Sequence, residues 1–152
     1  MDAFQLCETP LDLQALRENL LADGAGAYTS YEGWVRDKNL DQPVAVLEYH
    51  GYPQLAPSIA AAILAETHDR FDIHNAAFAH RTGRLSIGEV AIWVGVTATH
   101  RDAAFVACRY IVDQAKVRLP IWKKEMYTDG HSAWIQSRVG APDEAVASSD
   151  ET

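Results

Sequence analysis

The sequence has few cysteines, no long apolar run and no excess of positive charge, and each shortage excludes a class of protein. Cys7 and Cys108 lie far apart, which predicts free thiols of a cytosolic protein rather than a disulfide scaffold. No apolar run reaches the length of a membrane span, and the N-terminus lacks a signal-peptide pattern. The formal net charge of -8 argues against nucleic acid as the main partner, because phosphate binding needs a broad basic surface.

The apolar content of the chain is high enough for a packed core. Apolar residues make up 48% of the 152 residues, which predicts one domain over residues 1–140. Residues 141–152 carry acidic side chains and no lysine or arginine. We therefore expect them to form an acidic, disordered tail.

Alternating apolar patterns predict an α+β protein with one mixed, largely antiparallel sheet and helices packed on one side. Residues 89–97 are apolar on both faces, which is typical of a central strand. The short connection 81–88 favours antiparallel pairing. The expected strands are 4–7, 27–35, 44–50, 73–80 and 89–97, and the expected helices start near Thr9-Pro10, Ser58 and Thr99.

The third expected helix has the clearest pattern. Thr99 is its predicted N-cap, and Pro120 must end it because proline lacks an N–H group and clashes with the preceding turn. Five residues at 3-4-3-4 spacing predict a buried stripe: Phe105, Cys108, Val112, Ala115 and Leu119. The position of Cys108 in this stripe favours a core role over a reactive thiol.

Positive charge concentrates where this helix ends. Residues 116–125 (KVRLPIWKKE) hold four cations within nine positions of an otherwise acidic chain. The bend at Pro120 would turn Lys116 and Lys123 towards one point, and like charges brought together lower lysine pKa values. Lysines in a last helical turn also complement the helix dipole while remaining solvated, so spacing alone leaves both interpretations open.

Two further cationic positions suggest a pocket for a small anion. Arg36 follows a strand, and His100-Arg101 stand at a helix N-terminus, where free N–H groups suit a phosphate. Arg101 and Lys116 lie fifteen residues apart on one helix, which separates them by roughly 22 Å. If both serve one site, the site must be shared between the chains of a symmetric dimer.

Motifs for other chemistries are missing. The remaining histidines have no convincing metal spacing, although His74 and His80 share one face of an expected strand. No P-loop, dinucleotide fingerprint or nucleophile elbow occurs, so we expect neither a metal nor a cofactor. The four tryptophans are expected mostly in the core or an interface, but Trp122 could instead line the pocket against a planar ring.

From Phe4 to Trp134 the sequence resembles the molybdopterin synthase large-subunit (MoaE) family. It departs from the family at His50, where an acidic residue is more frequent, and at Leu55, where methionine is frequent. The segment beyond Trp134 is poorly covered. Five motifs carry the resemblance: EGWVR (32–36), LEYHGY (47–52), HRTGRLSIGE (80–89), THRDAAF (99–105) and KVRLPIWKKE (116–125).

The resemblance implies an α/β-hammerhead fold and a dimer, each subunit of which accepts a small ubiquitin-like sulfur-carrier subunit. The carrier's thiocarboxylated C-terminal glycine would supply two sulfurs to cyclic pyranopterin monophosphate, giving the molybdopterin dithiolene. By position, Lys116 and Lys123 would be catalytic. The implied substrate-binding residues are Trp34, Val35, Arg36, His100, Arg101, Lys124 and Glu125.

Three other functions stay open. The chain could bind a phosphorylated ligand or a carrier tail without chemistry, or it could transfer sulfur through its own cysteine. A nucleic-acid binder using the Trp-Lys stretch is the third, and the net charge disfavours it.

Overall fold

The computed structural model describes residues 3–138 and 141–145. In chain order the elements are β1 (Ala3–Cys7), α1 (Leu13–Glu18), β2 (Ala27–Trp34), β3 (Lys38–Asn39), β4 (Gln42–Gly51), α2 (Ala56–Arg70), β5 (Asn75–Arg81), β6 (Gly83–Ser86), β7 (Val90–Ala98), α3 (Arg101–Arg118), β8 (Ile121–Tyr127), β9 (Ser132–Arg138) and β10 (Ala141–Ala145). Among the described residues, no helix is long and apolar enough to cross a membrane.

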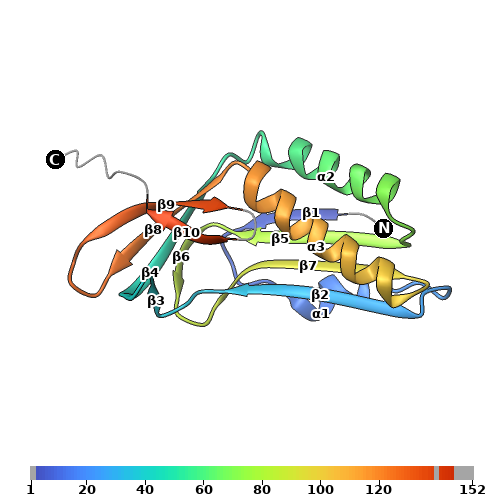
Figure 1. Ribbon diagram of the computed structural model, residues 1–152, viewed down its shortest axis with the longest axis horizontal. Helices are drawn as coiled ribbons and strands as arrows, with labels where there is room; N and C mark the ends of the chain where they lie inside the picture. Colours follow the sequence, from blue (N-terminus) through green and yellow to red (C-terminus); the bar gives the residue numbers. More distant parts are fainter. Residues whose placement is uncertain (1–2, 139–140, 146–152) are drawn as a thin grey trace.

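The strands form two sheets, shown at the two ends of the molecule in Figure 1. One has the order β1-β5-β7-β2, and the other has the order β10-β9-β8-β4-β3 with β6 also paired to β4. Only β1 and β5 pair in parallel among the described strands, so the predicted α+β class with largely antiparallel pairing is confirmed. The prediction of a single sheet is wrong. Gly83, with φ of 84°, lies where the chain leaves β5, and β6 then pairs with β4 instead of β7.

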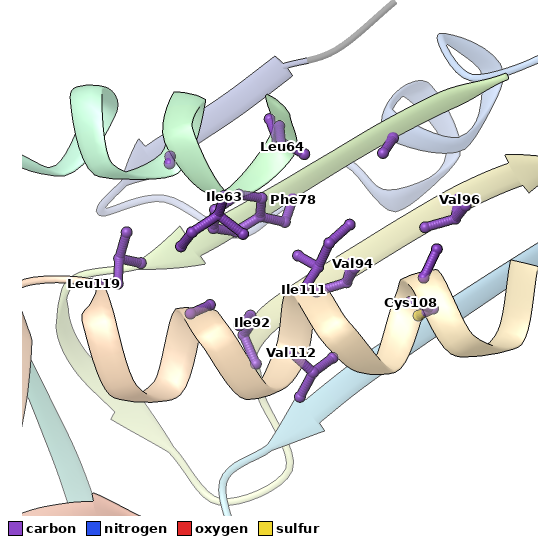
Figure 2. Close-up of a cluster of buried hydrophobic side chains, with 14 of the residues drawn as sticks. Ile63, Leu64, Phe78, Ile92, Val94, Val96, Cys108, Ile111, Val112 and Leu119 are labelled. Carbon is purple, nitrogen blue, oxygen red and sulfur yellow. The ribbon is translucent and has the colours of Figure 1, made fainter. Parts of the chain in front are cut away.

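The main core lies between the four-stranded sheet and helices α2 and α3, which lie along one face of it (Figures 1 and 2). Strand β7 is interior to this sheet and is buried along all but its first residue, as its apolar pattern predicted. Ile111 from α3 and Ile63 from α2 are fully buried in the cluster that contains Phe78 and Val94. The opposite face carries a smaller cluster of Leu20, Ala77 and Trp93.

Two helix starts differ from their predictions. The first helix begins at Leu13, because the Asp12 side chain accepts a hydrogen bond from Ala15 N at 3.1 Å and caps it, so Thr9 is not its N-cap. Helix α3 has His100 rather than Thr99 as its N-cap. The Thr99 hydroxyl instead forms a hydrogen bond with His74 Nε2 at 2.9 Å.

The predicted buried stripe of α3 is confirmed except at its start. Cys108, Val112, Ala115 and Leu119 are buried, but Phe105 is 61% exposed. Ala104 occupies the buried position of that turn, and each helical residue rotates by about 100° from its neighbour, which carries the Phe105 ring away from the sheet.

The second sheet contains two features that the sequence did not reveal. The polar segment after β2 leads into the β3–β4 hairpin, in which Leu40 and Asp41 adopt φ values of 49° and 66°. Residues 141–145 of the expected tail form β10, which pairs with β9. Backbone pairing explains why a segment without a strong apolar pattern is a strand there. The rest of the predicted tail, residues 146–152, lies outside the described part of the chain.

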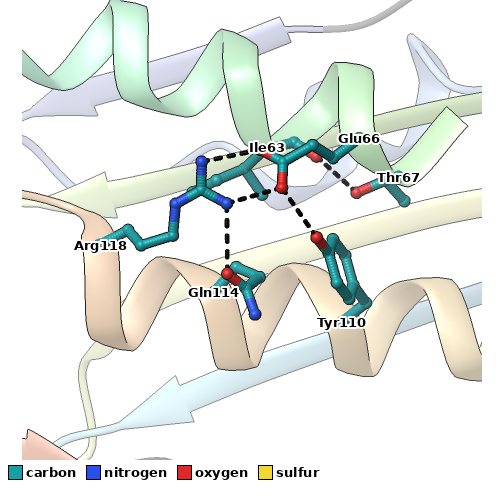
Figure 3. Close-up of polar contacts among 6 residues, drawn as sticks. All are labelled: Ile63, Glu66, Thr67, Tyr110, Gln114 and Arg118. Atoms are coloured by element: carbon teal, nitrogen blue, oxygen red, sulfur yellow. Dashed lines mark hydrogen bonds and ion pairs between the residues drawn. The ribbon is translucent and has the colours of Figure 1, made fainter. Parts of the chain in front are cut away.

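A polar network joins α2 to the last turn of α3 (Figure 3). Arg118 donates to both carboxylate oxygens of Glu66, at 2.9 and 2.7 Å, and to Gln114 at 3.2 Å. Tyr110 Oη donates to the same carboxylate at 3.0 Å. These contacts hold the C-terminal end of α3 against α2, two residues beyond Lys116.

Candidate active site

The site is built at the bend where α3 leads into β8. Leu119 has φ of -68° and ψ of 130°, an extended conformation imposed by the proline that follows it. The Pro120 carbonyl accepts a hydrogen bond from Tyr52 N at 3.2 Å, and β8 then pairs with β4. The bend therefore connects the helix covering one sheet to an interior strand of the other.

Lys116 and Lys123 line one cavity at this bend. The cavity has a volume of about 880 Å³, and strands of both sheets line it together with the end of α3. The lysines lie on either side of Pro120, so the structure brings together the two residues predicted to be catalytic.

The charged residues of the cavity wall are mostly cationic. Two carboxylates, Glu32 and Glu125, also line it, and Glu32 accepts a hydrogen bond from the Trp34 indole at 3.0 Å. An excess of positive charge in a hollow favours an anionic guest. The basic residues of the wall are Arg36, Lys38, Lys116, Arg118 and Lys123.

His80 lies in the same wall, on β5. Its Nδ1 is 2.7 Å from the Arg81 carbonyl oxygen, which can only accept, so Nδ1 carries a proton. Burial, opposed by the hydrogen bond to the Arg81 carbonyl and assisted by the positive charges of Lys116 and Lys123, lowers the pKa of His80 to about 4. The imidazole is therefore neutral at neutral pH, and both lysines lie near enough to act on it.

Glu125 belongs to the wall but is only 4% exposed. One of its oxygens accepts from Asn39 Nδ2 at 2.9 Å and from Tyr127 Oη at 3.0 Å. Burial, followed by this hydrogen bond to Glu125, raises the pKa of Tyr127 to about 12, so the phenol stays protonated as a donor. Asn39 Oδ1 in turn accepts from Arg36 Nη2 at 3.3 Å.

Of the two neighbouring residues Trp34 and Val35, both predicted to bind substrate, only Trp34 lines the cavity. Trp34 lines the cavity and is 65% exposed, whereas its neighbour Val35 is buried in a small core cluster and does not line the cavity. Trp122 also lines the cavity, at 46% exposure, with its ring 5.1 Å from that of Tyr52. Trp34 and Trp122 thus offer aromatic surface beside the cations.

Three predicted cationic residues lie away from the cavity wall within one chain. Lys124 points its ammonium group over the Trp134 ring, 5.7 Å from the centroid. His100 and Arg101 are at the opposite end of α3 from Lys116, as the length of this helix requires. The described residues of one chain therefore do not complete the predicted cluster.

The described residues contain no group of three or more histidine, cysteine or carboxylate side chains suited to a metal ion. His74 precedes β5 instead of lying on it, so the shared strand face expected for His74 and His80 is not formed. Burial raises the pKa of Cys108 to about 11, which keeps its thiol protonated.

Comparisons with known proteins identify the family of this chain. The model of the MoaE protein family matches residues 6–118. The chain belongs to the MoaE family. It is 36% identical to the molybdopterin synthase catalytic subunit of Bacillus subtilis, over 89% of this chain and 85% of that protein.

Solved structures support the same fold for this MoaE-family chain. It superimposes on the crystal structure of molybdopterin synthase from Staphylococcus aureus with a TM-score of 0.82 and 30% identity, over 86% of this chain and 95% of that one. A complex of subunits 1 and 2 of molybdopterin-converting factor from Helicobacter pylori matches with a TM-score of 0.69 over 83% of this chain and 86% of that one. Because the two sequences are only 22% identical, this match is evidence for the fold alone.

Sequence reasoning missed His80, Asn39 and Tyr127. His80 and Asn39 meet the site through residues far away in the chain, since Asn39 and Glu125 are 86 positions apart. Tyr127 lies only two residues from Glu125, but its sequence context does not show that its hydroxyl contacts this carboxylate. The HRTGR motif contains His80, but nothing local shows that this ring faces the lysines.

Proposed function

We propose that this chain is the catalytic subunit of a molybdopterin synthase. In this function it transfers two sulfurs from the thiocarboxylated C-terminus of a small sulfur-carrier subunit to cyclic pyranopterin monophosphate. The observation that carries the proposal is the convergence of Lys116 and Lys123 on one cationic cavity in a MoaE-family chain.

The chemistry suits the residues in the wall. The carrier's thiocarboxylate and the phosphate of the precursor are both anions, which the excess of lysine and arginine attracts. In each net exchange a sulfur replaces an oxygen on the pterin side chain, and the carrier is left with a carboxylate. A lysine ammonium group can donate the proton that the departing oxygen needs.

Ligand binding divides between the remaining predicted residues. Arg36 would contact the phosphate, and the exposed rings of Trp34 and Trp122 would flank the pterin. Neither cysteine is required, because sulfur arrives on the partner. The protonated, buried thiol of Cys108 agrees with this, since a sulfurtransferase needs an accessible thiolate.

The complete site takes residues from two chains. His100 and Arg101 lie a helix length from Lys116, so they would reach the phosphate and pterin in the cavity of a neighbouring subunit. The working assembly is then a homodimer of this chain with one carrier subunit on each member, a heterotetramer. Val35, Lys124 and Glu125 support this site from behind or beside it.

Reconstitution tests the function directly. Purified chain, thiocarboxylated carrier and cyclic pyranopterin monophosphate should yield the dithiolene product, detected after oxidation as a fluorescent pterin. Carrier with an ordinary carboxylate is the matched control and should yield none. Binding of carrier and precursor without product would favour the alternative, a non-catalytic binding module.

A sulfurtransferase that uses its own cysteine makes a different prediction. Cys108→Ser would abolish turnover under that mechanism, whereas here it leaves kcat nearly unchanged. Cys7→Ser tests the second thiol in the same way.

A further inference from the structure

A chain of hydrogen bonds stands behind Arg36 and ends on a buried carboxylate. Arg36 Nη2 donates to Asn39 Oδ1 at 3.3 Å, and Asn39 Nδ2 donates to Glu125 Oε1 at 2.9 Å. Tyr127 Oη donates to the same Glu125 oxygen at 3.0 Å. Arg36 and Glu125 line the cavity, while Asn39 is 5% exposed and does not. The amide therefore lies between the cation and the carboxylate, out of reach of a guest.

The chemistry of the two neighbours determines how the Asn39 amide is turned. A carboxylate only accepts hydrogen bonds, so the amide NH2 group must face Glu125. A guanidinium only donates, so the amide oxygen must face Arg36. Aspartate at this position would place a second carboxylate against Glu125, and an apolar residue would serve neither neighbour.

The position of Asn39 does not depend on Arg36. Asn39 pairs with Gln42 across the β3–β4 hairpin, whose turn residues Leu40 and Asp41 both have positive φ. Asn39 is thus held by backbone structure, and its side chain is a fixed point for the guanidinium to contact.

The inserted amide has a consequence for charge. Arginine and a carboxylate in direct contact form short, charge-assisted hydrogen bonds that use an edge of the planar guanidinium and offset its charge. Asn39 and Tyr127, both neutral, each donate a hydrogen bond to Glu125 Oε1, so this oxygen is paired without the guanidinium. Arg36 gives one N–H to Asn39 and keeps its other donors and its full charge for an anion.

We propose that Asn39 is a positioning residue that orients the Arg36 guanidinium towards the cavity and keeps it from pairing with Glu125. The inference rests on the proposed function, in which Arg36 contacts the phosphate of the substrate. The inference gives Asn39 a role in substrate binding: its amide separates Arg36 from the buried Glu125 carboxylate and leaves the guanidinium able to bind an anion.

A double-mutant cycle tests this. Asn39→Leu keeps the side-chain size and removes both hydrogen bonds. In the chain with native Arg36 we expect it to raise KM for the phosphorylated precursor, and Kd for inorganic pyrophosphate, by about tenfold, with kcat within about twofold. In the Arg36→Ala background the same substitution should change neither constant, because there is no guanidinium left to orient.

The controls separate positioning from folding. Gln42→Leu, on the facing strand of the same hairpin, should leave both constants unchanged. Asn39→Asp, which offers Arg36 a direct carboxylate partner, should weaken pyrophosphate binding more than Asn39→Leu does. Equal losses from Asn39→Leu in both Arg36 backgrounds, or an unchanged KM, would overturn the inference.

The failure of the proposed function would look different. If Arg36→Ala leaves KM and pyrophosphate affinity unchanged, Arg36 does not bind the anion. Both the proposed contact of Arg36 with the phosphate and the inference about Asn39 are then wrong. If Arg36→Ala weakens binding and Asn39→Leu does not, the inference alone falls. The pyrophosphate measurement is independent of turnover, so it decides the inference even if no dithiolene product forms.

Discussion

Lys116 and Lys123 show at the scale of single residues what a sequence can reveal about a site. The proline between them follows a long helical pattern and ends it, so the bend that separates the two lysines was predictable from local rules. The position of His80 in the site was not predictable, because this residue reaches the cavity through strand pairing that no local pattern encodes. Glu125 was assigned by resemblance, and it lines the cavity. Val35 and Lys124 were assigned by resemblance, and their side chains lie outside the cavity wall.

Lys116→Ala should remove most activity without unfolding the protein. The side chain lines the cavity and does not belong to the core cluster, so its removal leaves the packing intact. We expect kcat to fall by about 10²–10⁴-fold, the range for loss of a proton-transfer group, with a nearly unchanged Tm. Lys38→Ala, a second cation of the wall, is the matched control and should affect kcat far less. A large fall in the Tm of Lys116→Ala would contradict this account.

His80 predicts a pH dependence of stability. The pKa of His80 is about 4 in the folded chain, whereas its ordinary value, expected in the unfolded chain, is 6.5. Between these two pH values the unfolded chain therefore binds more protons than the folded chain. The free energy of unfolding therefore falls as the pH drops from 6.5 to 4, by at most about 3 kcal/mol from this group. Above pH 6.5 the contribution no longer varies.

Denaturant unfolding of wild type and His80→Gln at several pH values measures this contribution. Wild type should lose stability more steeply than His80→Gln between pH 6.5 and 4. The exposed His50→Gln variant controls for general charge effects and should follow wild type more closely. Parallel curves for wild type and His80→Gln would show that the imidazole is not held neutral.

At the scale of elements, the link between α2 and α3 keeps the end of α3, and with it Lys116, in place (Figure 3). Hydrogen bonds from Arg118, and then from Tyr110, lower the pKa of Glu66 below its ordinary value of 4.5. A carboxylate with a lowered pKa stabilises the fold above its unfolded pKa and loses that effect as the pH falls through the folded one.

Glu66→Gln should therefore lower Tm at neutral pH, and the difference from wild type should shrink towards zero as the pH falls below about 4.5. Asp113→Asn removes an exposed pair with Arg109 within α3 and is the matched control, with a smaller effect expected. Thermal scans at pH 7 and below pH 4 measure both. A Tm difference for Glu66→Gln that does not change with pH would exclude the ion pair as its cause.

Most helices and strands were predictable, because they follow from local periodicity and turn residues. Their exact ends were not predictable. Thr9-Pro10 matches the usual start of a helix, yet Asp12 makes the capping hydrogen bond. Phe105 fits the spacing of the buried stripe, yet it lies at the edge of that stripe and is exposed. In both cases nearby residues fit the same local pattern, and the sequence alone does not say which of them makes the contact.

At the scale of the whole molecule, the division into two sheets creates the cavity. The end of α3, which covers one sheet, continues directly into β8 of the other, and the walls come from strands of both (Figure 1). The sequence could not predict this division, because strand patterns specify faces and not partners. Family resemblance supplied the function that the residue patterns alone left open.

The length of α3 also determines the proposed assembly. With His100 and Arg101 at one end and Lys116 at the other, a site that needs all three must draw on two chains. Each chain then contributes to two cavities, and two different inactive variants can complement each other.

Mixing His100→Ala/Arg101→Ala chains with Lys116→Ala chains is the most direct test of this claim. After dissociation and random reassociation in equal amounts, half of the dimers are mixed, and each mixed dimer has one intact site. The account predicts two nearly inactive homodimers and recovery to about a quarter of wild-type turnover in the mixture. If the mixed dimers form and no activity returns, the lysines and the His100-Arg101 pair do not serve one shared site.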